Sequence, residues 1–224
     1  MNITDDKVTE YINGLYKPLN PFLSDLREAD EAENIPIILR ETETLLLTLL
    51  RIKKPDNILE IGTAVGYSAL CFVMSSPTVK VTTLELKEGM QKSALSNFEN
   101  AGMADRIEII PGDALQSLNA LIEKRRKGLI EPYDLIFIDG AKGHYLKIWE
   151  SCMKLCKTGT VIVSDNILYK AMTAADEYLD IRRNKTIVNR MRDYLKHITS
   201  QPDITTTVLP AGDGVAISVT GEKV

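Results

Sequence analysis

This 224-residue sequence has few cysteines, no long hydrophobic run and no excess of basic residues. No segment reaches the roughly 18 uninterrupted apolar residues of a transmembrane helix, so we expect no membrane partner. The start, residues 1–6, is acidic where a signal peptide is basic, which predicts a cytoplasmic protein. Three cysteines without CxxC spacing fit reduced thiols in a core better than a disulfide framework. The net charge of -4 argues against a protein that coats nucleic acid indiscriminately.

What the sequence does contain is the composition of one globular domain. Hydrophobic residues make up 44% and charged residues 26%, which is ordinary for such a domain. Because no repeat, low-complexity tract or flexible linker divides the chain, we expect a single domain over residues 1–224. Its predicted parts are a helical N-terminal cover over 1–52 and an α/β core over 53–224. Helices are predicted in the cover at about 5–16, after Pro18, and at 37–50.

From residue 57 onward, short apolar runs alternate with amphipathic segments. The runs predicted as buried strands are 58–61, 79–84, 107–110, 133–138 and 160–163. Helices are predicted between them at 67–74, 88–101, 114–127 and 145–156. Such alternation with right-handed crossovers gives an α/β fold with a doubly wound, mostly parallel sheet. After a helix at 185–199, runs at 204–209 and 215–219 joined by 210–214 predict a C-terminal antiparallel hairpin.

Hard oxygen ligands follow two of the predicted strands. Asp139 ends one strand, and Asp165 and Asn166 end the next. The carboxyl ends of parallel strands form the ligand crevice of an open sheet, and carboxylate and amide oxygens suit Mg²⁺ or another hard divalent cation. Three ligands leave coordination positions free, so we expect a substrate that chelates the cation through two oxygens.

The first strand–helix turn carries a cofactor signal. Gly62 and Gly66 permit a sharp turn and a close approach of ligand to backbone, but their G-x-x-x-G spacing matches neither a dinucleotide fingerprint nor a P-loop. Glu85, at the end of the second strand, is placed to accept hydrogen bonds from ribose hydroxyls, and Asp113 from an adenine amino group. Alternatively, Asp113 caps the next helix and Glu85 is a solvated strand end. Together the residues favour a nucleoside-binding crevice.

Two further features concern the acceptor. Lys142, three residues beyond Asp139, is placed to take or position a hydroxyl proton, although it would also simply neutralise the acidic residues. A basic segment opposed only by Asp193 comprises Arg182, Arg183, Lys185, Arg190, Arg192 and Lys196. Such a cluster suits RNA phosphates, whereas a solvated helix face is the general explanation of a charge run.

Residues 58–68, 137–142, 165–166 and 209–215 resemble the cation-dependent O-methyltransferases that include the catechol and caffeoyl-CoA methyltransferases. The resemblance covers nearly the whole chain. Ile35, Pro36, the Gly-Thr-Ala-x-Gly-Tyr-Ser pattern and the basic segment extend it to the bacterial branch that methylates 5-hydroxyuridine at the tRNA wobble position. The sequence departs from the family at Gly140, where Ala or another residue is common, and at Ala171, where Gly is.

The resemblance implies a Rossmann-like class I methyltransferase that binds S-adenosylmethionine and Mg²⁺. It places around the cofactor Glu60, Gly62, Gly66, Ser68, Glu85, Gly112, Asp113, Ala114 and Asp139. It assigns the cation to Asp139, Asp165 and Asn166, and catalysis to Lys142. The candidate RNA contacts are Arg182, Arg183, Lys185 and Arg190. The implied function is tRNA processing, and we expect a homodimer.

Several other functions remain open. A catechol presents two adjacent hydroxyls, and 5-hydroxyuridine presents a hydroxyl beside a carbonyl oxygen. One bound cation could therefore be chelated by either acceptor. Methylation of a small, catechol-like phenolic molecule is the main alternative to methylation of tRNA. A nicotinamide-dependent dehydrogenase would require the dinucleotide glycine pattern and would leave Asp165 and Asn166 without a role. A non-catalytic nucleoside-binding module would be indifferent to substitution of Asp139 or Lys142.

Overall fold

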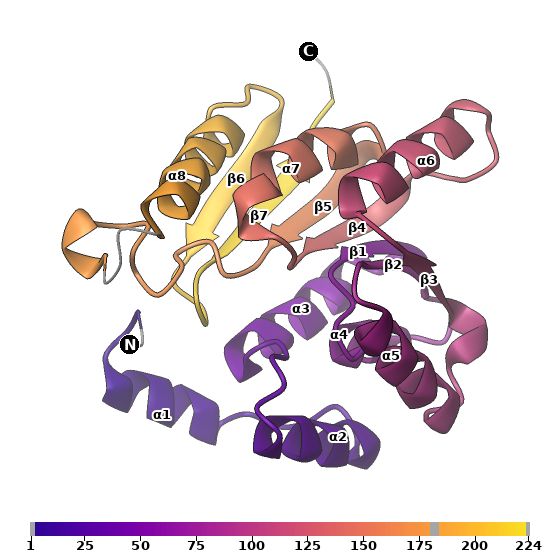
Figure 1. Cartoon of the computed structure of the whole chain (residues 1–224), viewed down its shortest axis with the longest axis horizontal. Helices are drawn as coiled ribbons and strands as arrows, with labels where there is room; N and C mark the ends of the chain where they lie inside the picture. Colours follow the sequence, from indigo (N-terminus) through magenta and orange to yellow (C-terminus); the bar gives the residue numbers. More distant parts are fainter. Residues whose placement is uncertain (1–2, 180–183, 223–224) are drawn as a thin grey trace.

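The computed structural model describes residues 3–179 and 184–222, and it contains one seven-stranded sheet (Figure 1). The strand order is β3-β2-β1-β4-β5-β7-β6. The strands are β1 (Asn57–Ile61), β2 (Lys80–Glu85), β3 (Ile107–Pro111), β4 (Tyr133–Ile138), β5 (Cys156–Ser164), β6 (Ile204–Leu209) and β7 (Val215–Thr220). Strands β1 to β5 run parallel to one another, whereas β7 runs antiparallel to both β5 and β6. The predicted doubly wound sheet and C-terminal hairpin are therefore confirmed.

Helices cover both faces of the sheet. The longer ones are α1 (Asp6–Gly14), α2 (Pro21–Ala32), α3 (Arg40–Lys53), α4 (Tyr67–Ser75), α5 (Glu88–Asn100), α6 (Ala114–Arg126), α7 (Tyr145–Met153) and α8 (Lys185–Thr199). Short 3-10 turns are η1 (Ala104–Arg106), η2 (Lys142–His144) and η3 (Asp176–Tyr178). Figure 1 shows α6, α7 and α8 on one side of the sheet and α3, α4 and α5 on the other. Within the described ranges, no helix combines the length and apolar character needed to cross a membrane.

Alternating side chains of the central strands supply two separate cores. Ile58, Leu135 and Phe137 pack with residues of α2, α3, α4 and α5. Leu59 and Ile136, their neighbours along the same strands, pack with residues of α6, α7 and α8. Because successive strand residues point to opposite faces, a strand covered on both sides must be apolar at nearly every position. This explains why the central strands appear in the sequence as continuous apolar runs.

The ends of two predicted helices are wrong. The helix predicted over 37–50 begins only at Arg40, since Leu39 has an extended backbone with φ -66° and ψ 157°. Pro36 lacks an N–H for a helical hydrogen bond and disfavours helical geometry at the residue before it. The helix predicted over 145–156 ends at Met153, and Cys156 already belongs to β5, where it pairs with Tyr133 of β4. Pairing with β4 therefore decided the second boundary.

Candidate active site

A cavity of about 420 Å³ opens at the carboxyl ends of β1, β2, β3 and β4, and we call it the cofactor cavity. Open α/β sheets bind ligands where the strand order reverses, and here the reversal falls between β1 and β4. Its volume is in the range of small-molecule sites. The residues predicted at the cofactor that line it are Gly62, Ser68, Glu85, Gly112, Asp113, Ala114 and Asp139.

Both glycines of the first turn are structurally required. Gly62 has a φ of +104°, and a Cβ there would lie 2.1 Å from the backbone oxygen of Asp139. Gly66 has a φ of +84°, and a Cβ there would lie 2.4 Å from the Phe98 ring. Gly66 itself is not among the lining residues, but Val65 and Tyr67 on either side of it are. Gly62 therefore lets the turn after β1 approach the residue that follows β4, and Gly66 lets the start of α4 approach α5.

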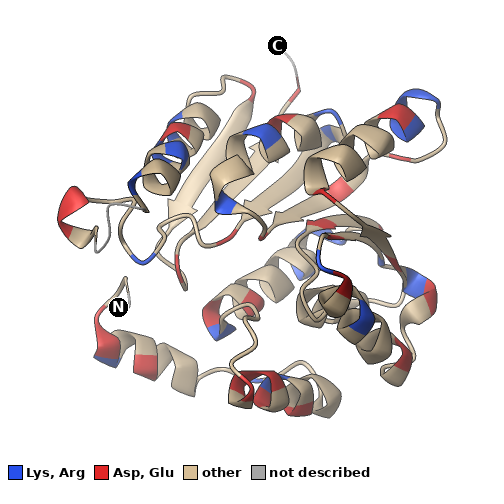
Figure 2. Ribbon diagram, in the orientation of Figure 1, with Lys and Arg blue, Asp and Glu red and all other residues tan. Residues whose placement is uncertain are grey.

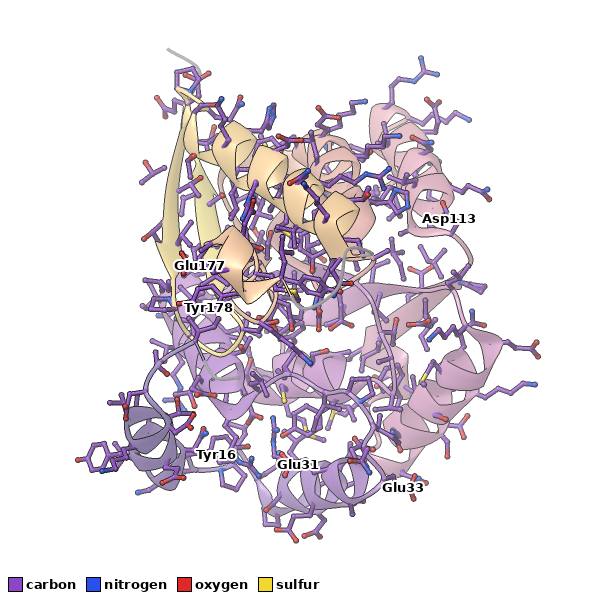
Figure 3. All side chains as sticks on the ribbon, turned by 60° about the vertical axis from the view of Figure 1, so that its left-hand side comes forward. Tyr16, Glu31, Glu33, Asp113, Glu177 and Tyr178 are labelled. Atoms are coloured by element: carbon purple, nitrogen blue, oxygen red, sulfur yellow. The ribbon has the colours of Figure 1, made fainter. Side chains whose placement is uncertain are left out.

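The two acidic residues predicted to contact a nucleoside both bind backbone amides. Glu85 accepts a hydrogen bond from Ala64 N at 2.9 Å and another from Lys87 N at 2.8 Å. Asp113, labelled in Figure 3, accepts hydrogen bonds from Leu115 N and Gln116 N. It therefore caps α6, as predicted by the alternative interpretation of this residue as a helix cap. Since both residues also line the cofactor cavity, each combines a turn-stabilising role with access to a bound ligand.

Glu60, predicted to face the cofactor, lies behind the cavity wall instead. Its side chain is fully buried, and its two oxygens accept hydrogen bonds from Ser68 Oγ and, at 2.6 Å, from Thr83 Oγ1. Burial raises the pKa of Glu60 to about 8, although both hydrogen bonds act to lower it. Ser68 does line the cavity, so Glu60 acts on the cofactor site through this serine.

Sequence reasoning missed part of the cavity wall. Pro36, Ile37 and Ile38 line the cavity in the non-helical stretch before α3, of which the last two were predicted as helix, and Leu86 lines it after Glu85. Leu86 is 67% exposed, unusual for a leucine beside a buried strand. An apolar residue directly after an acidic strand end is a sequence signal for this wall, because apolar walls are typical of ligand sites.

The predicted cation ligands come together at the ends of β4 and β5, and we call Asp139, Asp165 and Asn166 the acidic site. Asn166 Nδ2 donates to Asp139 Oδ1 at 3.3 Å, and Asn166 N donates to Asp165 Oδ1 at 2.7 Å. Asp165 is 2% exposed, and its backbone N–H donates to Ile138 O at 3.0 Å. Asn166 adopts a left-handed φ of 58°, which brings its side chain back toward Asp139.

The electrostatics of the acidic site fit a hard divalent cation. Burial, together with the charge of Asp139, raises the pKa of Asp165, while burial raises that of Asp139 and Lys142 opposes this. Two buried carboxylates side by side disfavour each other's ionised form unless a cation joins them. In the described part of the chain no group of three or more His, Cys, Asp or Glu residues is arranged for a metal, and a cation at the acidic site would take the amide oxygen of Asn166 as a third ligand.

A second cavity of about 240 Å³ lies on the other side of the acidic site. Its lining residues are Ile3, Ile37, Ile38, Leu39, Asp165, Asn166, Lys170, Gly212 and Asp213. Ile37 and Ile38 line both cavities, while Asp139 belongs to the cofactor cavity and its partner Asn166 to the second. The acidic site therefore contributes to both a cofactor-sized space and a smaller one whose lining mixes apolar with polar and charged residues.

Lys142 lies close to the acidic site but outside both cavity linings. It begins η2, and its Nζ lies 5.2 Å from the centre of the Tyr169 ring, a cation–π contact. Its charge acts on Asp139, Asp165 and Asp213 alike and opposes part of the rise that burial causes in the pKa of each carboxyl. The structure therefore brings Lys142 to the acidic site, and its catalytic role stays a prediction.

The basic segment divides into different environments. Arg182 and Arg183 lie outside the described residues. Arg192 already contacts other residues of the chain: its Nη1 donates to Asp176 Oδ1 at 2.6 Å, and its Nε donates to Thr173 O at 2.9 Å. Figure 2 shows the acidic η3 beside the cationic residues of α8. Lys185 and Arg190 are exposed, and Arg190 Nη1 donates to Gly143 O at 3.3 Å.

Known proteins share this arrangement across almost the entire chain. A family described as O-methyltransferase matches residues 16–220. Caffeoyl-CoA O-methyltransferase 1 of Eucalyptus globulus is 30% identical over 202 residues, which cover 87% of this chain and 80% of that protein. These matches span the cofactor cavity, the acidic site and the C-terminal hairpin.

Solved structures match equally well. A Staphylococcus aureus protein provisionally named a caffeoyl-CoA O-methyltransferase superposes with a TM-score of 0.87 and 33% identity, covering 96% of this chain and 100% of that one. The Bacillus cereus O-methyltransferase in complex with SAH has a TM-score of 0.80 and 30% identity, over 96% and 97% of the two chains. TomG of Streptomyces achromogenes, in complex with SAM, has a TM-score of 0.80 and 26% identity, over 96% of each chain.

Proposed function

The chain belongs to the O-methyltransferase family, and from this premise we propose that its acceptor is a small aromatic molecule with two neighbouring hydroxyl groups. It has the α/β fold of class I methyltransferases and is an S-adenosylmethionine-dependent O-methyltransferase. One observation carries the choice of acceptor: the acidic site contributes residues to both the cofactor cavity and the smaller cavity, where isoleucine and leucine side chains add apolar surface beside the oxygen ligands. The caffeoyl-CoA O-methyltransferases among its relatives support the same class of acceptor.

The acidic site would hold a hard divalent cation such as Mg²⁺ through Asp139, Asp165 and Asn166. When bound, such a cation supplies Lewis acidity that makes a neighbouring hydroxyl easier to ionise. Ile37 and Ile38 form an apolar wall shared by both cavities, which excludes water between donor and acceptor. An acceptor with two adjacent oxygens and an otherwise apolar ring matches these surroundings.

The proposed transfer moves one methyl group and one proton. The acceptor oxygen forms a bond to the methyl carbon of S-adenosylmethionine while the bond from that carbon to sulfur breaks, leaving S-adenosylhomocysteine. The hydroxyl proton passes to the amine of Lys142, which must be neutral when it accepts it. Holding donor and acceptor in line contributes about 7–11 kcal/mol to rate acceleration in favourable cases. The paired cavities on either side of the acidic site provide such alignment.

Labelled methyl transfer to matched phenols tests the proposal. We expect the purified enzyme with Mg²⁺ to methylate 3,4-dihydroxybenzoate and caffeate, and to leave 4-hydroxybenzoate unmethylated, since that compound lacks the second hydroxyl. Equal transfer to the monohydroxyl compound would contradict the requirement for two oxygens. Transfer to none of these phenols, with transfer to another acceptor, would contradict the proposed substrate class.

A second candidate acceptor is 5-hydroxyuridine at the tRNA wobble position, which also presents two adjacent oxygens. The observation in its favour is the exposed Arg190, whose hydrogen bond to Gly143 places a cationic side chain beside η2 and Lys142. Phosphate contacts of this kind make RNA binding fall steeply with salt. The same assay with hydroxyuridine-containing tRNA decides: salt-sensitive transfer that Arg190→Gln weakens supports the tRNA acceptor, and no transfer rejects it.

A further inference from the structure

We infer that Arg27, Glu43 and Tyr67 form a positioning cluster that fixes the wall of the cofactor cavity from behind. Tyr67 belongs to the Gly-Thr-Ala-x-Gly-Tyr-Ser pattern, but the sequence assigned no role to it, to Arg27 or to Glu43. The inference concerns cofactor binding, so it does not depend on which acceptor the enzyme methylates. It assigns to the N-terminal helices a specific part in building the cofactor site.

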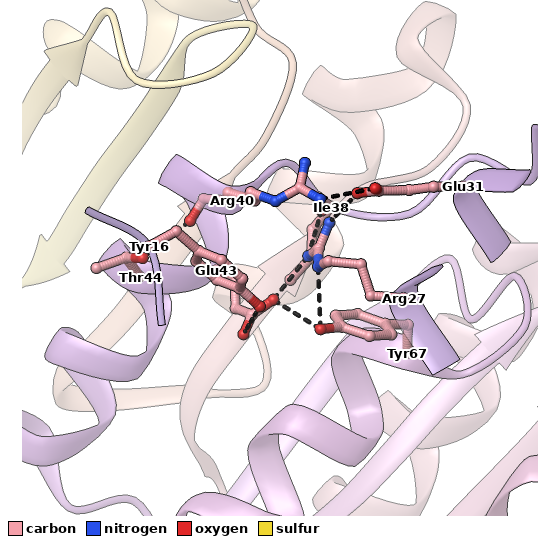
Figure 4. Close-up of polar contacts among 8 residues, drawn as sticks. All are labelled: Tyr16, Arg27, Glu31, Ile38, Arg40, Glu43, Thr44 and Tyr67. Carbon is pink, nitrogen blue, oxygen red and sulfur yellow. Dashed lines mark hydrogen bonds and ion pairs between the residues drawn. The ribbon is translucent and has the colours of Figure 1, made fainter. Parts of the chain in front are cut away.

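The positioning cluster joins three helices through one buried ion pair (Figure 4). Arg27 of α2 contacts Glu43 of α3 through Nη2 at 2.6 Å, and it donates through Nε to Tyr67 OH of α4 at 3.2 Å. Tyr67 OH in turn donates to Glu43 Oε2 at 2.8 Å. The relative exposures of the three residues are 3%, 0% and 2%, so water does not replace these contacts.

Two contacts connect the cluster to the cavity wall. Arg27 Nη2 donates to the backbone oxygen of Ile38 at 2.9 Å, in the non-helical stretch before α3 that lines both cavities. Tyr67 lines the cofactor cavity and is the first residue of α4, directly after Gly66. The guanidinium group therefore holds two separate sections of the cavity wall at fixed distances from each other.

The choice of an arginine at this buried place is informative. Its planar guanidinium group directs donors at fixed angles, and here Nε, Nη1 and Nη2 reach Tyr67, Glu31 and the Ile38–Glu43 pair respectively. Apolar side chains of similar volume are often as stabilising as a buried ion pair, because both charges must be desolvated. Stability alone therefore does not require Arg27, whereas the orientation of a backbone carbonyl and a hydroxyl does.

The ends of the cluster also reach the first linker. Tyr16 OH donates to Glu43 Oε1 at 2.9 Å, and the Arg27 guanidinium lies 5.5 Å from the Tyr16 ring centre and 4.6 Å from that of Tyr67. Tyr16 lies in the segment between α1 and α2. Both carboxylate oxygens of Glu43 are thus bonded, and a substitution at Arg27 would leave a buried negative charge with only tyrosine partners.

Isothermal titration with S-adenosylhomocysteine tests the inference without any acceptor. We expect Arg27→Met to weaken binding by about tenfold or more, as loss of a residue supporting a site commonly does. The matched control is Leu121→Ala, which truncates a buried residue of α6 outside both cavities and lowers the melting temperature through the opposite core. If the two variants lose melting temperature and affinity in the same proportion, the inference is overturned.

Two further variants separate positioning from folding should Arg27→Met be poorly folded. Arg27→Met combined with Glu43→Met removes both charges, and we expect its melting temperature to recover while its affinity does not. Tyr67→Phe removes one buried hydroxyl, with Tyr194→Phe as its counterpart on the other face, where the hydroxyl bonds Ser164 at 2.6 Å. Only Tyr67→Phe should weaken binding. Recovery of affinity in the double variant, or equal losses in the two tyrosine variants, would overturn the inference.

Discussion

The positioning cluster and the acidic site are both buried and polar, but their charges are balanced in opposite ways. In the positioning cluster Arg27 neutralises Glu43, and the tyrosines complete the hydrogen bonds of the carboxylate. In the acidic site two buried carboxyls, Asp139 and Asp165, lie together and their pKa values are raised. The positive charge of Lys142 opposes this rise only in part. A balanced cluster is complete within the chain, whereas an unbalanced one indicates a charged ligand.

The two clusters also differ in backbone conformation. Besides Asn166, the residues Tyr169, Lys170 and Ala171 have positive φ values, of 46°, 55° and 66°. Left-handed geometry costs a non-glycine residue roughly 1–2 kcal/mol. Asp213 holds this stretch by accepting from Lys170 N at 2.5 Å. Strain therefore gathers around the unbalanced cluster, as it commonly does at functional sites.

The largest effect should come from breaking the balanced cluster. We expect Arg27→Met to lower the free energy of unfolding by about 3–5 kcal/mol, because it leaves Glu43 buried without its cation. The double variant with Glu43→Met should recover most of this loss. Urea denaturation of both proteins measures the difference, and a double variant no more stable than the single one would show that the charge imbalance is not the cause.

Removing a charge from the unbalanced cluster should have the reverse effect on stability. We expect Asp165→Asn to lower the rate of methyl transfer by on the order of 100-fold, since misplaced reactants cost that much. Its melting temperature in EDTA should rise by about 2–4 °C, equivalent to roughly 1 kcal/mol, because the repulsion with Asp139 is gone. A variant that is both active and less stable would contradict this reading of the acidic site.

The pH dependence of stability sharpens the comparison through Glu60. Its pKa in the folded protein is about 8, raised from 4.5, so the folded state binds the proton more tightly than the unfolded state. Stability from this group is therefore full below about pH 4.5 and is lost as pH rises to about 8, by a few kcal/mol at most. Glu60→Gln should make the denaturation midpoint depend less on pH between about 4.5 and 8. If the midpoint of the variant changes with pH as steeply as that of the unsubstituted protein, Glu60 is not the group responsible.

The smallest effect concerns the strained backbone beside the acidic site. We expect Ala171→Gly to stabilise the protein by roughly 0.5–1 kcal/mol, because relief of the left-handed conformation exceeds the added entropy of glycine in the unfolded chain. Ala174→Gly, three residues along and without a positive φ, is the control and should destabilise. Thermal denaturation distinguishes the two, and equal losses would show that the strain at Ala171 is relieved in some other way.

Much of the site followed from the sequence because its residues are tied to strand ends. Asp139, Asp165 and Gly62 each lie just beyond a largely apolar strand, and parallel strands bring their carboxyl ends to one edge whatever the details of packing. The same logic placed Glu85 and Gly112 at the cofactor cavity. Local capping was ambiguous in the sequence, and Asp113 proved to cap α6 while also lining the cavity.

By itself, the sequence determined the α/β class, the order of strands and helices, and the gathering of hard oxygen ligands, because these depend on periodicity and on residues adjacent along the chain. Only the tertiary structure decided that Glu60 lies behind the wall, that residues 35–39 are not helical, and that Arg27 meets Glu43 and Tyr67. Such contacts join residues 16 to 40 positions apart, and whether a charge on a helix faces water or a partner depends on what packs over it.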